Sequence, residues 1–172
     1  MSEFINVEYI ERDFQDIATK GEGEMKVREA LLNEANELSE LALNSKATWD
    51  YSEEFILACK EDLTITEAYI VNNYVYVLEN QGVKIGFFSF LRKEEDALDF
   101  LYLHPNYKGK GYGKLLWQSV VERAANLGIK RFTIDSDPNA KGYYMKMGAK
   151  LIGETPSTVF KDRILPLLQY DV

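Results

Sequence analysis

The residues from Lys108 to Lys114 place three glycines and three lysines around one tyrosine, between a predicted strand and a predicted helix. Glycine allows a positive φ angle and a close approach of the backbone to a ligand. The first turn of a helix adds unpaired N–H groups and the positive end of the helix dipole. Together these features predict an anion site, most naturally for phosphate. The candidate ligand-binding residues are Lys108, Gly109, Lys110, Gly111, Tyr112, Gly113 and Lys114.

Two common phosphate-binding motifs do not fit this stretch. The dinucleotide fingerprint G-x-G-x-x-G, read from Gly109, meets Lys114 where it requires its last glycine. The P-loop pattern, aligned on Gly113, meets Lys108 at its first glycine and Leu115 at its serine or threonine. The stretch is then interpreted as a phosphate site of another kind, and two alternatives to that interpretation stay open. One is a glycine-rich turn before an ordinary helix, and the other is a nucleotide-binding protein.

A second stretch gives the first one a family context. Residues 108–113 resemble motif A of the GNAT N-acetyltransferases, [QR]-x-x-G-x-[GA], with lysine at the position of arginine or glutamine. Residues 137–149 resemble motif B, N-x-x-A-x-x-[FY]-Y-x-x-x-G-[FA], in the correct order and at the correct spacing. The resemblance covers most of residues 25–172. Residues 45–51 and 153–157 are similar to one bacterial branch of this superfamily whose acceptor is not known.

The resemblance implies a fold, a co-substrate and a binding mode. The fold is α/β (α+β), with a mixed, mostly antiparallel central sheet flanked by helices. The co-substrate is acetyl-CoA, with its pyrophosphate on the glycine-rich turn. Strands at 97–103 and 131–136 are expected to separate, so that the pantetheine arm lies along Leu101, Tyr102 and Leu103 like an added strand. Asn139 is the expected hydrogen-bond partner of the pantetheine amides.

The expected reaction is acetyl transfer to a primary amine of a small molecule or a protein. The departing thiolate needs a proton, and the resemblance assigns the general acid to Tyr144. A phenol of pKa ~10 stays protonated at neutral pH and is able to donate as the thiolate forms. A core aromatic with a satisfied hydroxyl is the alternative for Tyr144, and Tyr143 suits that structural part better. A non-catalytic coenzyme A-binding sensor or interaction module is the alternative function.

The acceptor amine has a pKa of ~10.4 and must lose a proton before it attacks. Asp99 is the first candidate base, because it lies on the same face of its strand as Leu103. Glu79 is a second candidate. His104 precedes a proline at the strand end, which favours a structural role. A backbone N–H near Tyr102 or Leu103 is suited to stabilise the oxyanion.

Three aromatic residues are expected at the acceptor pocket. The resemblance places Trp49 and Tyr51 in a helix–turn–helix that covers this pocket, and Phe88 on the opposite wall. Packing in the core is the alternative for all three.

Composition excludes several other classes. The chain has 172 residues, of which 46% are hydrophobic, and suits one domain at 25–172 after an N-terminal extension at 1–24. The single cysteine, Cys59, excludes a disulfide framework and a multi-cysteine metal site, and the single histidine argues against a zinc site. A net charge of −8 argues against nucleic acid as a partner. The absence of an apolar run of ~18–20 residues argues against a membrane span. We expect a cytoplasmic monomer or homodimer.

The remaining pattern predicts the element order β-α-α-β-β-β-α-β-α-β-β. Helices are expected from Asn33 and Ser52 as caps, from the glycine-rich turn to Leu127, and from Asp137 as a cap to Gly148. Pro166 predicts that the last strand lies at an edge or carries a bulge. The predicted strands are 25–31, 74–78, 83–91, 97–103, 131–136, 150–153 and 163–168. The extension, which carries −5 of the net charge, is expected to pack on its own domain or on a second copy.

Overall fold

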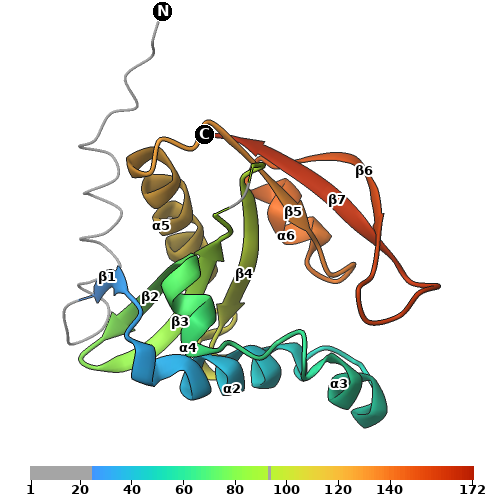
Figure 1. Cartoon of the computed structure of the whole chain (residues 1–172), viewed down its shortest axis with the longest axis horizontal. Helices are drawn as coiled ribbons and strands as arrows, with labels where there is room; N and C mark the ends of the chain where they lie inside the picture. The colour runs from blue at the N-terminus through green and yellow to red at the C-terminus, as the bar shows by residue number, and fades with distance from the viewer. Residues whose placement is uncertain (1–24, 93) are drawn as a thin grey trace, which may run out of the picture.

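One seven-stranded sheet, in the order β1-β2-β3-β4-β5-β7-β6, organises the computed structural model, which describes residues 25–92 and 94–172 (Figure 1). The predictions for the extension at 1–24 lie outside the described residues. The strands are β1 (Met25–Glu29), β2 (Tyr74–Asn80), β3 (Val83–Phe90), β4 (Ala97–Leu103), β5 (Arg131–Asp135), β6 (Lys150–Pro156) and β7 (Ile164–Asp171). Neighbouring strands are antiparallel apart from β4 and β5, which are parallel. The predicted fold class is confirmed.

Five α-helices flank this sheet in the described part of the chain. They are α2 (Ala35–Lys46), α3 (Glu53–Cys59), α4 (Glu67–Asn72), α5 (Tyr112–Asn126) and α6 (Lys141–Lys146), with short 3-10 turns at Leu32–Glu34 and Pro105–Tyr107. The sequence did not predict α4, whose six residues are too few to show a helical period. Its start is fixed locally, because the Thr66 side chain accepts a hydrogen bond from the Tyr69 N–H at 3.0 Å.

The sheet has a separate apolar core on each face. Helices α5 and α6 cover one face, where Leu116 and Val120 pack against Phe88. Helices α2 and α4 cover the other, where Leu38 packs with Phe87. Consecutive residues of a strand point to opposite faces, so Phe87 and Phe88 enter different cores. Both side chains are 0% exposed.

Strands β4 and β5 begin as neighbours and then separate. They pair at only two positions, Ala97 with Thr133 and Leu98 with Ile134, although β4 continues to Leu103. Figure 1 shows the two strands moving apart toward α2. On the other side of β4, Phe90 pairs with Leu98 and Ser89 with Phe100, which leaves Asp99 as an inserted residue. The predicted separation of the two strands is therefore confirmed.

Two predicted helix caps are wrong. Asn33 lies inside the 3-10 turn, and the Glu34 carboxylate accepts from the Leu31 N–H at 2.8 Å instead. Asp137 accepts from the Asn139 N–H at 2.8 Å, but α6 begins only at Lys141. Asn33 lies two residues before the start of α2 and Asp137 four residues before the start of α6, because a turn precedes each helix.

The prediction for Pro166 is also wrong. Strand β7 lies between β5 and β6, and the edge strand with the register shift is β6. The Pro166 carbonyl accepts a hydrogen bond from the Ser136 N–H at 2.9 Å. The ring nitrogen of Pro166 therefore faces the β5 side of the strand, at a level just beyond Asp135, the last residue of β5. Proline is tolerated in this interior strand because the ladder of β5 ends before it.

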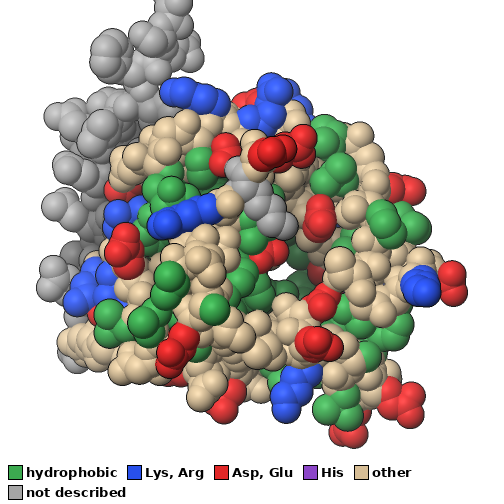
Figure 2. Space-filling view, in the orientation of Figure 1, with side chains coloured by type: hydrophobic (Ala, Val, Ile, Leu, Met, Phe, Trp, Pro, Cys, Tyr) green, Lys and Arg blue, Asp and Glu red, His purple; other side chains and the backbone are tan. Residues whose placement is uncertain are grey.

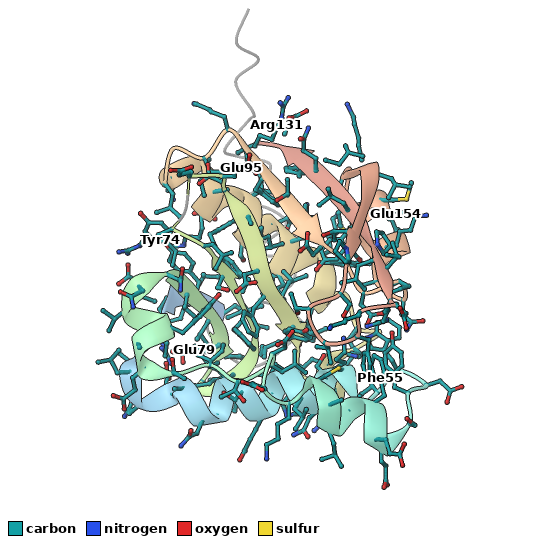
Figure 3. The ribbon with its side chains drawn as sticks, turned by 45° about the vertical axis from the view of Figure 1, so that its right-hand side comes forward. Phe55, Tyr74, Glu79, Glu95, Arg131 and Glu154 are labelled. Atoms are coloured by element: carbon teal, nitrogen blue, oxygen red, sulfur yellow. The ribbon has the colours of Figure 1, made fainter. Side chains whose placement is uncertain are left out.

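An ion-pair network fixes the edge strand β1 to the rest of the sheet. Arg28 donates to both oxygens of Glu34, at 2.9 and 2.6 Å, and to Glu79 at 2.8 Å. The Arg28 hydrogen bonds lower the pKa of Glu34 to about 2 and also lower the pKa of Glu79. Figure 3 shows Glu79 on the β1–β2 side of the molecule, opposite Phe55 of α3. Glu79, the second candidate base, is therefore a structural residue.

We expect Glu34→Gln to lower the free energy of unfolding by about 1–2 kcal/mol at pH 7, because it weakens charged hydrogen bonds to Arg28. The folded-state pKa is depressed, so the carboxylate contributes stability above its ordinary pKa of 4.5 and loses it as the pH falls toward 2. Denaturant melts should show the two proteins converging at low pH. Glu37→Gln, which loses only a contact of Lys84 with a mostly exposed side chain, is the control. An equal effect of both variants at every pH would contradict this account.

Candidate active site

A cavity of about 310 Å³ lies where β4 and β5 separate. Figure 2 shows an opening through the molecule at this place. The walls come from α2, from β4, from the glycine-rich turn and start of α5, and from the β5–α6 region. The lining residues include Ser45, Lys46, Trp49, Leu98, Asp99, Leu101, Tyr102, Leu103, Lys108, Gly109, Gly113, Leu116, Ile134, Asp135, Asp137, Ala140, Tyr143 and Tyr144. The sequence therefore predicted much of this wall.

The glycine-rich turn has the backbone that its sequence predicts. Gly109 and Gly111 have φ angles of 72° and 87°, and Gly111 is the residue that precedes the first turn of α5. A Cβ atom built on either glycine would meet nothing within 4 Å. Open space therefore faces a helix start whose N–H groups have no helical partners. This arrangement is suited to an anion such as a phosphate.

Strand β4 presents unpaired backbone to the cavity. His104 donates its N–H to the Ile85 carbonyl of β3 at 2.7 Å, and Phe100 donates to the Ser89 Oγ at 3.2 Å. Because backbone groups alternate along a strand, the N–H groups of Leu101 and Leu103 point the other way, toward the side that β5 has left. An extended ligand with amide groups would complete this edge as a strand does.

Two adjacent tyrosines have different environments. The Tyr143 hydroxyl donates to the Gly113 carbonyl at 2.7 Å and ties α6 to the start of α5, the structural part expected for it. The Tyr144 side chain is 7% exposed and lines the cavity. Within residues 25–92 and 94–172 its hydroxyl has no hydrogen-bond partner. Burial raises the pKa of Tyr144, so the phenol keeps its proton.

The lysines of the turn are not equivalent. Lys108 donates to the Ser45 carbonyl at 3.0 Å and to the Thr48 hydroxyl, and its Nζ lies 5.1 Å from the centre of the Trp49 ring. Burial lowers the pKa of Lys108. Its ammonium thus connects the turn to the end of α2 rather than extending over the glycines. Lys110 is exposed and does not line the cavity.

A polar cluster, which we term the Asp137 clasp, joins the two sides of the cleft. Asp137 accepts from Lys46 at 3.0 Å, from Tyr51 at 2.9 Å and from Arg163 at 3.4 Å. The Tyr51 oxygen in turn accepts hydrogen bonds from Arg163 at 2.7 Å and from the Asn139 side-chain amide at 3.0 Å. Lys46 and Tyr51 come from the α2–α3 region, whereas Asp137 follows β5 and Arg163 precedes β7. The clasp therefore spans the open end of the separated strands.

The clasp shifts the acidity of its members. Burial alone would raise the pKa of Asp137, but hydrogen bonds from Asn139 and Lys46 outweigh it and hold the pKa below its usual value. Burial and the Asp137 charge raise the pKa of Tyr51 to about 12. Phe55 stacks on Tyr51, with ring centres 4.1 Å apart, and Figure 3 shows it on α3 beside the segment that leads to β7. Neither Asp137 nor Tyr51 therefore changes charge near neutral pH.

Several predicted site residues lie elsewhere. Phe88 is fully buried under α5 and lines no part of the cavity, so the expectation that it forms an acceptor wall is wrong. Tyr51 and Asn139 belong to the clasp, and neither lines the cavity. Trp49 lines this cavity, and its contact with the acceptor stays a prediction. Lys46 and Arg163 could not be singled out from the sequence, because isolated cations far apart in the chain resemble ordinary surface residues.

Asp99 sits at the point where the strands part. The Tyr69 hydroxyl of α4 donates to its carboxylate at 2.5 Å and also contacts the Ser89 Oγ at 2.7 Å. Burial and the Asp99 charge raise the pKa of Tyr69.

His104 is structural as expected, because its Nδ1 accepts a hydrogen bond from the Asn106 N–H at 3.1 Å. In the part of the chain that the structure describes, no cluster of His, Cys, Asp and Glu is suited to a metal ion, and no helix could cross a membrane.

Comparison with known proteins agrees with this geometry. Residues 31–160 match the family model described as an acetyltransferase (GNAT) domain. The chain is 26% identical over 132 residues to the 5-NmdU N-acetyltransferase of Pseudomonas phage PaMx11, which covers 75% of this chain and 89% of that protein. It is 36% identical over 69 residues to the L-ornithine N5-acetyltransferase NATA1 of Arabidopsis thaliana, covering 38% of this chain and only 30% of that protein.

A solved structure shows the same fold. The PaiA N-acetyltransferase of Thermoplasma acidophilum, crystallised in complex with coenzyme A, superimposes with a TM-score of 0.68 at 20% identity. The match covers 87% of this chain and 99% of that one.

We expect Gly111→Ala to weaken binding of acetyl-CoA at least tenfold, or ~1.4 kcal/mol. An alanine at a φ angle of 87° is strained, and relief of the strain turns the peptide planes whose N–H groups face the open space. Calorimetric titration measures the affinity. Gly128→Ala is the matched control, since Gly128 has a φ angle of 76° and open surroundings at the other end of α5. Equal affinities in the two folded variants would remove the glycine-rich turn from the binding site.

Proposed function

Since the chain belongs to the GNAT acetyltransferase family, we propose that it transfers the acetyl group of acetyl-CoA directly to a primary amine of a small molecule. One observation carries this proposal: a single cavity brings together the glycine-rich turn, the unpaired edge of β4 and the unpartnered hydroxyl of Tyr144. These three features match the phosphate, the amide-bearing arm and the sulfur of one long molecule. The names of the two sequence relatives support an amine nitrogen as the acceptor.

The residues of the cavity divide the binding of acetyl-CoA among them. The N–H groups from Gly109 to Lys114 hold the pyrophosphate, assisted by the dipole of α5. The backbone of Leu103 and the carbonyl of Leu101 pair with the amides of the arm. Side chains of the same strand and of α5, among them Leu116, surround the arm and exclude water. Bound in this way, acetyl-CoA supplies a thioester carbonyl that an amine attacks.

The proposed chemistry needs three protein groups. Asp99, directly or through a water, takes the proton of the acceptor ammonium, and the free amine forms a bond to the carbonyl carbon. The N–H of Leu101, which faces the gap two residues from Asp99, stabilises the oxyanion. As the carbon–sulfur bond breaks, Tyr144 donates its proton to the thiolate, and the second proton that leaves the attacking nitrogen restores the Tyr144 hydroxyl. The products are an N-acetylated amine and coenzyme A with a free thiol.

This assignment gives Tyr144 a role that its burial supports. Burial raises the pKa of Tyr144, so the phenol keeps its proton in the resting site, and the same burial raises the proton affinity of a thiolate that forms beside it. Tyr102, which lines the same cavity, also has its pKa raised by burial, with the neighbouring Tyr144 as a further cause. The site therefore holds phenols that stay protonated until charge develops on the sulfur.

We expect Tyr144→Phe to lower kcat about 10²-fold while acetyl-CoA binding changes little, because the ring stays and only the proton is lost. Release of free thiol in the presence of an amine measures the rate. Tyr143→Phe is the control: it breaks the bond to the Gly113 carbonyl and should reduce thermal stability more than kcat. A larger fall of kcat in Tyr143→Phe would show that the acid had been assigned to the wrong tyrosine. A wild-type protein that binds acetyl-CoA but never releases thiol would be a binding module.

We expect Asp99→Asn to lower kcat/KM most at low pH and to recover as the pH approaches ~10.4, where solution supplies the free amine. The measurement is a pH profile of both proteins. Glu154→Gln is the control, because Glu154 is an exposed carboxylate on the edge strand β6 (Figure 3). A loss that is uniform across pH would assign Asp99 to positioning rather than to proton transfer.

A further inference from the structure

A second cavity, of about 360 Å³, adjoins the first. Its walls come from the α3–α4 region, from β4 and from residues 156–165. Four residues line both cavities: Lys46, Asp99, Tyr102 and Asp135. The Asp137 clasp lies at this boundary, because Asp137 lines the first cavity and Arg163 the second. A molecule in the second cavity therefore reaches the reacting end of the first.

Two carboxylates stand at the junction. The register of β4 and β5 pairs Leu98 with Ile134, so the next position sets Asp99 opposite Asp135, where pairing ends. Tyr69 contacts Asp99 from the α4 face of the sheet. Ile134 is buried in the core under α5, and strand alternation therefore turns Asp135 to that same α4 face. Both carboxylates thus face the second cavity from neighbouring strands.

The Asp135 carboxylate has no compensating cation in the structure. Among the described residues, its side chain has no hydrogen bond or ion pair. Partial burial raises its pKa, although the residue as a whole is exposed. The two cations of the lining, Lys46 and Arg163, are both directed at Asp137. The reacting end of the second cavity is therefore short of positive charge.

A third carboxylate, Asp62, lines the second cavity but not the first. Asp62 lies in the turn after α3 and accepts a hydrogen bond from Thr158. Tyr69, Phe100 and Leu63 add apolar and aromatic surface to a lining that is otherwise polar. Such surface is suited to an aliphatic chain, and the carboxylates of the lining are suited to cations.

We propose that the second cavity is the acceptor site and that it takes a small primary amine whose aliphatic chain carries a second cationic group. The reacting ammonium lies between Asp99 and Asp135, and the distant cation meets Asp62. An acceptor with a carboxylate at its far end would place that charge against Asp62, which is unfavourable. The proposal rests on the proposed function, because the first cavity must supply the acetyl group.

The test compares acceptors of one chain length that differ in their far group. We expect α,ω-diamines of three to six carbons to include one whose kcat/KM exceeds that of its monoamine by about fivefold or more, the scale of one partly exposed ion pair. The matching ω-amino acid should be poorer than the monoamine. Asp62→Asn should remove the advantage of the diamine and bring its kcat/KM down to about that of the monoamine. Glu61→Gln, an exposed neighbour outside the lining, is the control and should retain the advantage.

A binding measurement separates recognition from chemistry. Calorimetry of the best diamine with the coenzyme A-bound protein should give a weaker affinity for Asp62→Asn and for Asp135→Asn than for wild type. Thiol release with monoamines or ω-amino acids as good as with diamines would overturn this inference and leave the proposed function standing. A lysine-containing peptide that outperforms every diamine would do the same. Binding of acetyl-CoA without thiol release from any amine would overturn both.

Discussion

The site depends on one event in the sheet, the end of pairing between β4 and β5 after two positions. Interior strands normally satisfy their backbone groups on both sides, so a strand that loses its neighbour presents donors and acceptors which a ligand is able to satisfy. The inserted residue Asp99 lies at this point, and the N–H groups beyond it face the gap. The opening is thus a property of hydrogen-bond register, and the helices around it only determine what enters.

A sheet that opens also needs something to hold its halves together. The Asp137 clasp does this with one carboxylate, which accepts hydrogen bonds from Lys46, Tyr51 and Arg163 of other segments of the chain. Partly buried charges are favourable only when they are well paired and hydrogen-bonded. Stacking of Phe55 between Tyr51 and Phe160, at 4.1 and 5.0 Å, adds apolar contact at the same junction. The clasp and the short β4–β5 ladder together set the width of the cleft.

Local signals in the sequence were sufficient for the parts of the site that are local. The φ angles of Gly109 and Gly111 and the start of α5 follow from residue types over a few residues, whereas Tyr144 was expected at the site from the resemblance to motif B. The errors have non-local causes. Phe88 and Phe87 have similar sequence environments, and only the tertiary arrangement decides which core each enters. Asp137 is a residue type typical of a helix cap, but it forms an ion pair instead, and its partner Arg163 lies 26 residues away in the sequence. Short α4 shows no period at all.

The clasp has a consequence for protein engineering. Three connections, between α2 and α3, between β5 and α6, and between β6 and β7, each contribute side chains to the surroundings of one carboxylate. A graft that exchanged any one of them for the corresponding loop of a relative would leave a charge without its counterpart in a partly buried position. Loop-swapping libraries that aim at new substrates should therefore move the three connections as a set. Within that set, the length of each loop is free to vary only as far as its charged residue still reaches Asp137.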